Sequence, residues 1–154
     1  MSLTLEEQAT NFATMRHIER VRNLLTGIVV EILERAKLHD QSKLEHPEVA
    51  LFNTHTCKLA GCEYGSAEYK QLLKELDPAL QHHYANNRHH PEHHKEGIND
   101  MNIVDVVEML CDWKAASERH NTGNIRKSIE VNAPRFNLSP QLARILENSV
   151  DLLT

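Results

Sequence analysis

The stretch "TLEEQATNFATMRHIERVRNLLTGIVVEILERAK", residues 4–37, decides the fold class of this chain. Thr4, with Glu7 three positions later, has the form of a capping box, in which two side chains bind the free backbone N–H groups at a helix start. Apolar residues then recur every three or four positions, at Ile18, Val21, Leu25, Ile28, Ile32 and Ala36. This spacing predicts one long helix that continues to Lys37.

The rest of the sequence predicts further helices joined by short polar loops. Helical spacing of apolar residues and capping signals predict helices over 66–76, from Asp77 through 82–83, over about 101–119, over about 123–131 and from Ser139 onward. A short helix is expected after Pro47. No stretch has the sustained alternation and hairpin turns that are typical of β-strands. The sequence therefore predicts an all-α fold, a single-domain helical bundle over residues 1–154.

Composition limits the class of protein. Hydrophobic residues make up 40% and charged residues 25% of the 154 positions, which suits a globular domain with its own core. The net charge of -5 argues against broad electrostatic binding to nucleic acid. The apolar runs are too short to cross a bilayer, and "MSLTLEEQ" has no signal-peptide pattern. We therefore expect a cytoplasmic protein whose three cysteines are free thiols.

Six of the eleven histidines lie in "QHHYANNRHHPEHH", residues 81–94. Imidazoles titrate near neutral pH, so a cluster of them can stay neutral and act as metal ligands. His83 and His90 are the ligands that we expect from this stretch, whereas His93 and His94, beyond Pro91, are expected to face solvent. The alternative is a solvated loop whose affinity for metals is adventitious.

A second candidate is "KLHDQSK", residues 37–43, where His39 and Asp40 stand side by side at the end of a predicted helix. Adjacent residues of a regular helix point about 100° apart, so both can reach one ion only where the helix ends. A neutral imidazole and a carboxylate suit Mn, Fe, Co, Ni or Zn. The alternative is an exposed helix end with His39 near the negative end of the helix dipole.

The third candidate is "IVDVVEMLCDWKAAS", residues 103–117, in which Asp105, Glu108 and Asp112 share one helical face. Such a stripe is usually a solvated surface. Asp112, however, is flanked by apolar residues and Trp113, and a buried carboxylate needs a partner or a metal. We therefore favour Asp112 over Asp105 as a ligand.

A histidine on an early helix, an adjacent His-Asp pair and a later Asp together resemble the H…HD…D pattern of the HD-domain superfamily of metal-dependent phosphohydrolases. The matching residues are His17 in "MRHIERV", His39 and Asp40 in "LHDQSK", and Asp112 in "LCDWKAA". "HDQSK" also looks like the HD-x-x-K form of the branches with two metals, which implies a role for Lys43. Over residues 15–120 the sequence is similar to a small, largely uncharacterised family of phages and bacteria.

The resemblance implies an HD-like helical bundle that hydrolyses a nucleotide or another small phosphoester. One or two divalent ions would be held by metal ligands from the set His17, His39, Asp40, His83, His90 and Asp112. His82 and His89 are implied as groups that orient ligands, carry protons or bind a second ion. Lys43 and Arg88 would neutralise the substrate phosphate.

The position of His17 sets a geometric condition. His17 and His39 are 22 positions apart, which is about 33 Å along an unbroken helix. Both can bind one ion only if the chain doubles back near residue 28, and Gly27 stands at that point.

Two alternative functions remain open at this stage. Some HD-fold proteins hold a di-iron centre and oxidise their substrates with O2, and the histidine-rich stretch here fits that ligand count as well. The chain could also be a metal-stabilised phage accessory or interaction protein without catalysis. A homo-oligomer is compatible with the sequence. The number of ions and the identity of the substrate are not specified by it.

Overall fold

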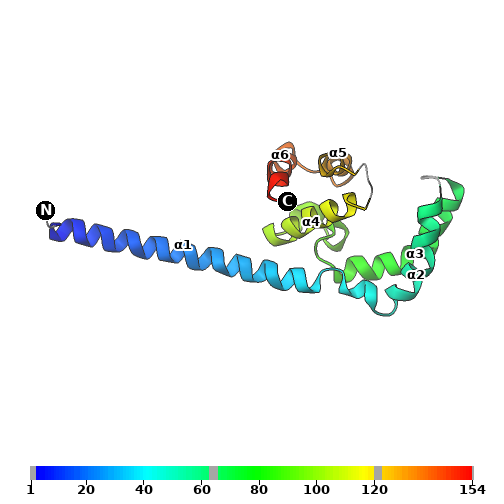
Figure 1. Cartoon of the computed structure of the whole chain (residues 1–154), viewed down its shortest axis with the longest axis horizontal. Coiled ribbons are helices and arrows are strands. Elements are labelled where there is room, and N and C mark those ends of the chain that lie inside the picture. Colours follow the sequence, from blue (N-terminus) through cyan, green and yellow to red (C-terminus); the bar gives the residue numbers. More distant parts are fainter. Residues whose placement is uncertain (1–2, 63–65, 120–122, 154) are drawn as a thin grey trace. The chain divides into compact units, whose positions relative to one another are not determined.

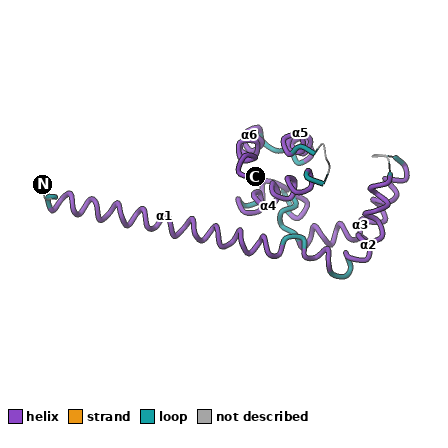
Figure 2. The backbone as a smooth tube through the Cα atoms, viewed as in Figure 1, coloured by secondary structure: helices purple, strands orange, loops and turns teal. Residues whose placement is uncertain are grey.

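The computed structural model describes residues 3–62, 66–119 and 123–153, with side chains at all but four of these positions, 56, 57, 59 and 60. The described part contains six α-helices and no strand. Figures 1 and 2 show the course of the chain through these helices. The expected all-α class is therefore confirmed. The chain groups into two units, Met1–Lys37 and Leu38–Thr154.

Helix α1 runs without a break from Leu5 to Leu38. Its start is the expected capping box, because Thr4 N donates to Glu7 Oε2 at 2.7 Å and Glu7 N donates to Thr4 Oγ1 at 3.2 Å. The turn near residue 28 that His17 would need is absent from this described segment, and Gly27 lies inside the helix.

Helices α2, Glu48–Gly61, and α3, Ala67–Asn86, pack against each other. Helix α2 is longer than the short helix expected after Pro47. The expected break at Asp77 is wrong, because Pro78 lies inside α3. Leu76 and Ala79, on either side of Pro78, are buried, and this packing offsets the cost of about 3 kcal/mol that an interior proline brings.

The main hydrophobic core joins α4, Ile103–Ser117, α5, Ile125–Arg135, and α6, Pro140–Ser149. Each of these helices is capped at its start. The side chain of the N-cap residue accepts a hydrogen bond from a backbone N–H group of the first turn; the N-cap residues are Asn102, Asn124 and Ser139. The core residues are Val106, Met109, Leu110, Ile125, Ile129, Leu138 and Leu146.

Short 3-10 helices complete the chain: η1, Gln41–Leu44, η2, Pro91–His93, η3, Gly97–Asp100, and η4, Val150–Leu152. Segment η1 follows α1 and contacts both α2 and α3, while η2 contacts α3. These contacts bring residues 39–43 to the C-terminal end of α3. None of the described helices is long and apolar enough to span a membrane.

Candidate metal centre

The centre is built around Asp40, which follows the end of α1 at Leu38. Asp40 has φ 57°, in the left-handed region that non-glycine residues rarely adopt. The chain therefore leaves the helical path between Leu38 and Gln41. This change of direction lets His39 and Asp40 face a common point, with His39 Nε2 3.6 Å from Asp40 Oδ2.

Three histidines at and beyond the end of α3 surround the other side of Asp40. His83 Nε2 lies 3.2 Å and His89 Nε2 lies 3.6 Å from Asp40 Oδ1. His83 Nε2 and His90 Nε2 are 2.9 Å apart. His83 and His89 are each only 1% exposed, so the cluster is closed on this side.

Helix α4 contributes two carboxylates. Asp112 Oδ1 lies 3.7 Å from His39 Nε2, and Glu108 Oε1 lies 2.9 Å from His39 Nδ1. Glu108 Oε1 is also 3.1 Å from His89 Nδ1. Only the contact with His39 has hydrogen-bond geometry, so Glu108 holds the Nδ1 side of the His39 ring and leaves its Nε2 atom directed toward Asp40.

Glu48 contacts the Nδ1 atom of His83, as Glu108 contacts that of His39. Its side chain is fully buried, and Glu48 Oε2 lies 2.9 Å from His83 Nδ1. Ser42 Oγ donates to Glu48 Oε2 at 3.1 Å. Carboxylates that accept from one imidazole nitrogen set the tautomer and orientation of a metal-binding ring. Glu48 and Glu108 thus orient two of the rings whose Nε2 atoms converge, those of His83 and His39.

Three groups of side chains have ligand atoms within 4.8 Å of one another. They are Asp40 with His83, His89 and His90; His39 with Asp40 and Asp112; and His39 with His89 and Glu108. The first two groups share Asp40. In the third group, Glu108 Oε1 lies against the Nδ1 atoms of His39 and His89, and we interpret Glu108 as a residue that supports these rings rather than as a metal ligand.

The donor set and its spacing fit a transition metal. Two ligand atoms that bind one ion at about 2.1 Å lie roughly 3.0 to 3.4 Å apart in octahedral or tetrahedral geometry. The observed separations of 2.9 to 3.7 Å lie close to that range. In addition, buried Asp40 Oδ1 and His89 Nε2 have no hydrogen-bond partner among the described residues. Buried polar atoms without partners are rare, and a bound cation would satisfy both of these.

The electrostatics of the cluster favour the forms that bind metals. Burial, together with the neighbouring His89 and His83, lowers the pKa of His90 to about 3, so its ring is neutral. Burial alone would raise the pKa of Asp40, but the contacts with His83 and Lys43 outweigh it and hold that pKa well below its usual range. His39 differs, because Asp112 and Glu108 raise its pKa to about 10.

The structure brings together five of the six residues expected as ligands, namely His39, Asp40, His83, His90 and Asp112. His89, expected in a supporting or second-ion role, lies among them. His17 lies on α1, 21 residues before its last residue, and belongs to none of the three groups.

The remaining expected site residues make contacts within the protein. Lys43 Nζ lies 2.6 Å from Asp40 Oδ2. His82, which is outside the three groups, has its Nδ1 2.7 Å from Glu48 Oε1. Arg88 donates from Nε and Nη2 to the two carboxylate oxygens of Asp105, at 3.2 and 3.0 Å. These two donor atoms therefore bind Asp105 and not a group of the cluster.

The expectation of solvent exposure is wrong for His94, whereas His93 is half-buried. The side chain of His94 is only 6% exposed, and its Nε2 lies 2.9 Å from the backbone oxygen of Arg88. His93 Nδ1 lies 2.8 Å from the backbone oxygen of Tyr84. Both imidazoles therefore hold the loop that carries His89 and His90 in place.

Sequence reasoning missed Glu48 and did not assign Glu108 a role. Glu108 does share a helical face with Asp112, and that spacing was the available signal. Glu48 follows Pro47 at a helix start, a common position for an exposed acid.

Comparison with curated proteins and with solved structures finds no match for this chain. A family model described as a family of unknown function, DUF5662, matches residues 6–152, and the chain therefore belongs to this family.

Proposed function

We propose that this protein is a metal-dependent phosphohydrolase that acts on a nucleotide or another small phosphoester. The observation that carries the proposal is the convergence of three imidazole Nε2 atoms on the two oxygens of Asp40, at 3.2 to 3.6 Å. The resemblance of the H…HD…D pattern to HD-domain phosphohydrolases supports the choice of reaction.

The ligand groups suggest two ions that share Asp40. In this proposal His83, His89, His90 and Asp40 would hold one ion, and His39, Asp40 and Asp112 would hold the other. Imidazole and carboxylate donors without thiolate suit Mn, Fe, Co, Ni or Zn. His17 is not part of this set.

The accessible edge of the cluster favours substrate chemistry there. The side chains of His39, Asp112 and Lys43 are 30%, 22% and 34% exposed, in contrast to buried His83 and His89. When bound, a divalent ion supplies a water of lowered pKa and polarises a phosphoryl oxygen. Lys43, at this edge, would neutralise charge on the substrate phosphate, and buried His83 and His89 would keep water from the opposite side.

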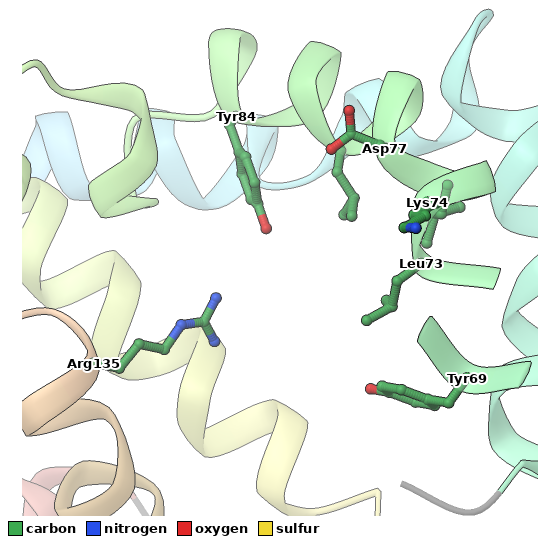
Figure 3. Close-up of a pocket in the computed structure, with 8 residues that line it drawn as sticks. Tyr69, Leu73, Lys74, Asp77, Tyr84 and Arg135 are labelled. Carbon is green, nitrogen blue, oxygen red and sulfur yellow. The ribbon is translucent and has the colours of Figure 1, made fainter. Parts of the chain in front are cut away.

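A groove next to the cluster could hold the organic part of the substrate. Its volume is about 800 Å³. Figure 3 shows the hydroxyl groups of Tyr69 and Tyr84 and the guanidinium of Arg135 directed toward the same open space. The Tyr84 ring lies 5.0 Å from the His90 ring, centroid to centroid, so groove and cluster share a wall. The lining includes two tyrosines and two cations, Lys74 and Arg135, against the single carboxylate of Asp77, and this balance suits a nucleoside phosphate.

The proposal is tested with untagged protein loaded separately with Mn, Fe, Co, Ni or Zn. Release of phosphate or of the alcohol is measured for a panel of nucleoside phosphates and nitrophenyl phosphoesters. We expect turnover with at least one metal. Lys43→Gln should lower kcat/KM about 100-fold while metal content is retained, and the exposed Lys37→Gln serves as control.

Two outcomes would contradict this function. Iron-dependent oxygen uptake without phosphoester cleavage would assign the cluster to an oxidase. Bound metal that raises the melting temperature, without turnover of any substrate in the panel, would assign it to a structural role.

A further inference from the structure

Helix α1 carries most of the exposed apolar surface of the described chain. Eighteen large apolar side chains are exposed among the described residues, and twelve of them lie between Leu5 and Leu38. Many are about half exposed, such as Ile18 at 51% and Leu25 at 58%. A helix of this kind is normally stabilised by packing of its apolar face, because intrinsic propensity alone contributes little.

These side chains form a continuous stripe. With 100° per residue, eight apolar residues fall within about 140° of the helix circumference. They are Met15, Ile18, Val21, Leu25, Ile28, Val29, Ile32 and Leu33, which we call the α1 stripe. Between residues 15 and 36, Arg22 is the only charged residue in this arc. It lies near the edge, where its long side chain can reach solvent.

The described part of the second unit offers no comparable surface. Its exposed large apolar residues are single side chains on five different elements, namely Leu44, Ile103, Val131, Ile145 and Leu152. Isolated exposed residues of this kind are ordinary on a protein surface. The matching apolar face that the chain itself provides is therefore another α1 stripe.

We propose that two copies of this chain associate through their α1 stripes. The central residues Ile18, Val21, Leu25, Ile28 and Ile32 alternate at intervals of three and four, as in the seam between two supercoiled helices. With roughly 90 Å² from each of seven exposed stripe residues, a pair of helices buries about 1,300 Å². That area is at the lower end of the range for specific interfaces.

Two valines of α1 allow a matched test. Val21 lies in the stripe and Val30 lies about 180° away on the opposite face. Both are substantially exposed, at 39% and 52%. The same replacement by glutamate therefore places a charge inside the proposed interface at Val21 and outside it at Val30, with a similar effect on helix propensity.

The test is sedimentation equilibrium of the full-length untagged chain between about 1 and 100 µM. We expect a mass twice that of the 17.7 kDa chain. Val21→Glu should raise the dimer dissociation constant about 100-fold or more, and Val30→Glu should leave it within about threefold. The fluorescence of Trp113, which stacks on Phe136 at 6.0 Å, reports whether the second unit remains folded in each variant.

Three results would overturn the proposal. The first is a wild-type monomer at 100 µM, which would mean that α1 is covered within its own chain or by a different protein. The second is equal weakening by Val21→Glu and Val30→Glu. The third is a dimer that Val21→Glu leaves intact while the Trp113 signal is unchanged.

Discussion

His83 Nδ1 lies 2.9 Å from Glu48 Oε2, and both side chains are almost completely buried. Because a carboxylate only accepts hydrogen bonds, this contact keeps a proton on Nδ1, so Nε2, beside Asp40 and His90, is the atom that a metal would take. Glu48 thus determines which atom of His83 is offered to a metal, although Glu48 itself is outside all three ligand groups.

Replacement of Glu48 should weaken metal binding without the loss of any ligand atom. We expect Glu48→Gln to lower metal affinity about 10- to 100-fold, because a neutral amide fixes the tautomer of His83 less strongly. Competition with a chromogenic chelator measures the affinity. Glu75→Gln is the control, since Glu75 pairs with His55 at 3.1 Å in a similar contact outside the cluster. Equal affinities for the two variants would show that Glu48 does not orient His83.

Metal binding should release a proton from His39. Asp112 and Glu108 raise the pKa of His39 from the usual range of an imidazole to about 10, so the ring is protonated at neutral pH without metal. A metal at Nε2 must displace that proton, and apparent affinity should rise with pH up to about 10, roughly tenfold per unit. Calorimetry in buffers of different ionisation enthalpy measures the release. Affinity that is constant between pH 6 and 9 would contradict it.

Gly27→Ala should stabilise α1. The glycine lies inside the helix, and a Cβ added there meets no atom within 4 Å. Because glycine costs about 0.5–1 kcal/mol relative to alanine in a helix interior, we expect a gain of that size. Far-UV circular dichroism during thermal unfolding measures it. Destabilisation would indicate that the chain turns at Gly27 after all.

Arg135 should contribute to substrate affinity and not to metal binding. It lies on α5, lines the groove beside Tyr84, and pairs with Glu92 at 3.1 Å. For a nucleotide that the protein hydrolyses, we expect Arg135→Gln to raise KM about tenfold with little change in kcat or metal content. Arg126→Gln, on the same helix but paired with Asp151, is the control. An unchanged KM would remove the groove from the substrate site.

Local signals in the sequence predicted most of the helices. Thr4, Ser66 and Ser139 cap helices where expected, because capping depends on residues only two or three positions apart. The predicted helix start at Asp77 was wrong, because Asp77 followed by Pro78 has the pattern of an N-cap and a first helical residue, yet Pro78 lies inside α3. Leu76 and Ala79, on either side of Pro78, are buried, and this burial favours a continuous helix over a helix start. Burial depends on tertiary packing, which the local sequence does not specify.

The candidate site was predictable in its ligand types and less so in its supporting residues. His39, Asp40 and Asp112 stand out because a histidine and carboxylates occur where a helix ends or where the surroundings are apolar. The contacts of His39 with Glu108 and of His83 with Glu48 join residues 69 and 35 positions apart. Such pairs depend on how α2, α3 and α4 pack, which no local pattern specifies.

The most direct test of the account is the metal content of untagged protein after loading and desalting, measured by inductively coupled plasma mass spectrometry. We predict at least one equivalent of transition metal per wild-type chain and less than about one tenth of that in Asp40→Asn, because Asp40 belongs to both proposed ion sites. Asp112→Asn should lose only the ion that His39, Asp40 and Asp112 would hold. The controls His17→Gln and Asp151→Asn should retain the wild-type amount. Wild-type protein without metal after loading with Mn, Fe, Co, Ni and Zn, or Asp40→Asn with the full amount, would contradict the proposed centre.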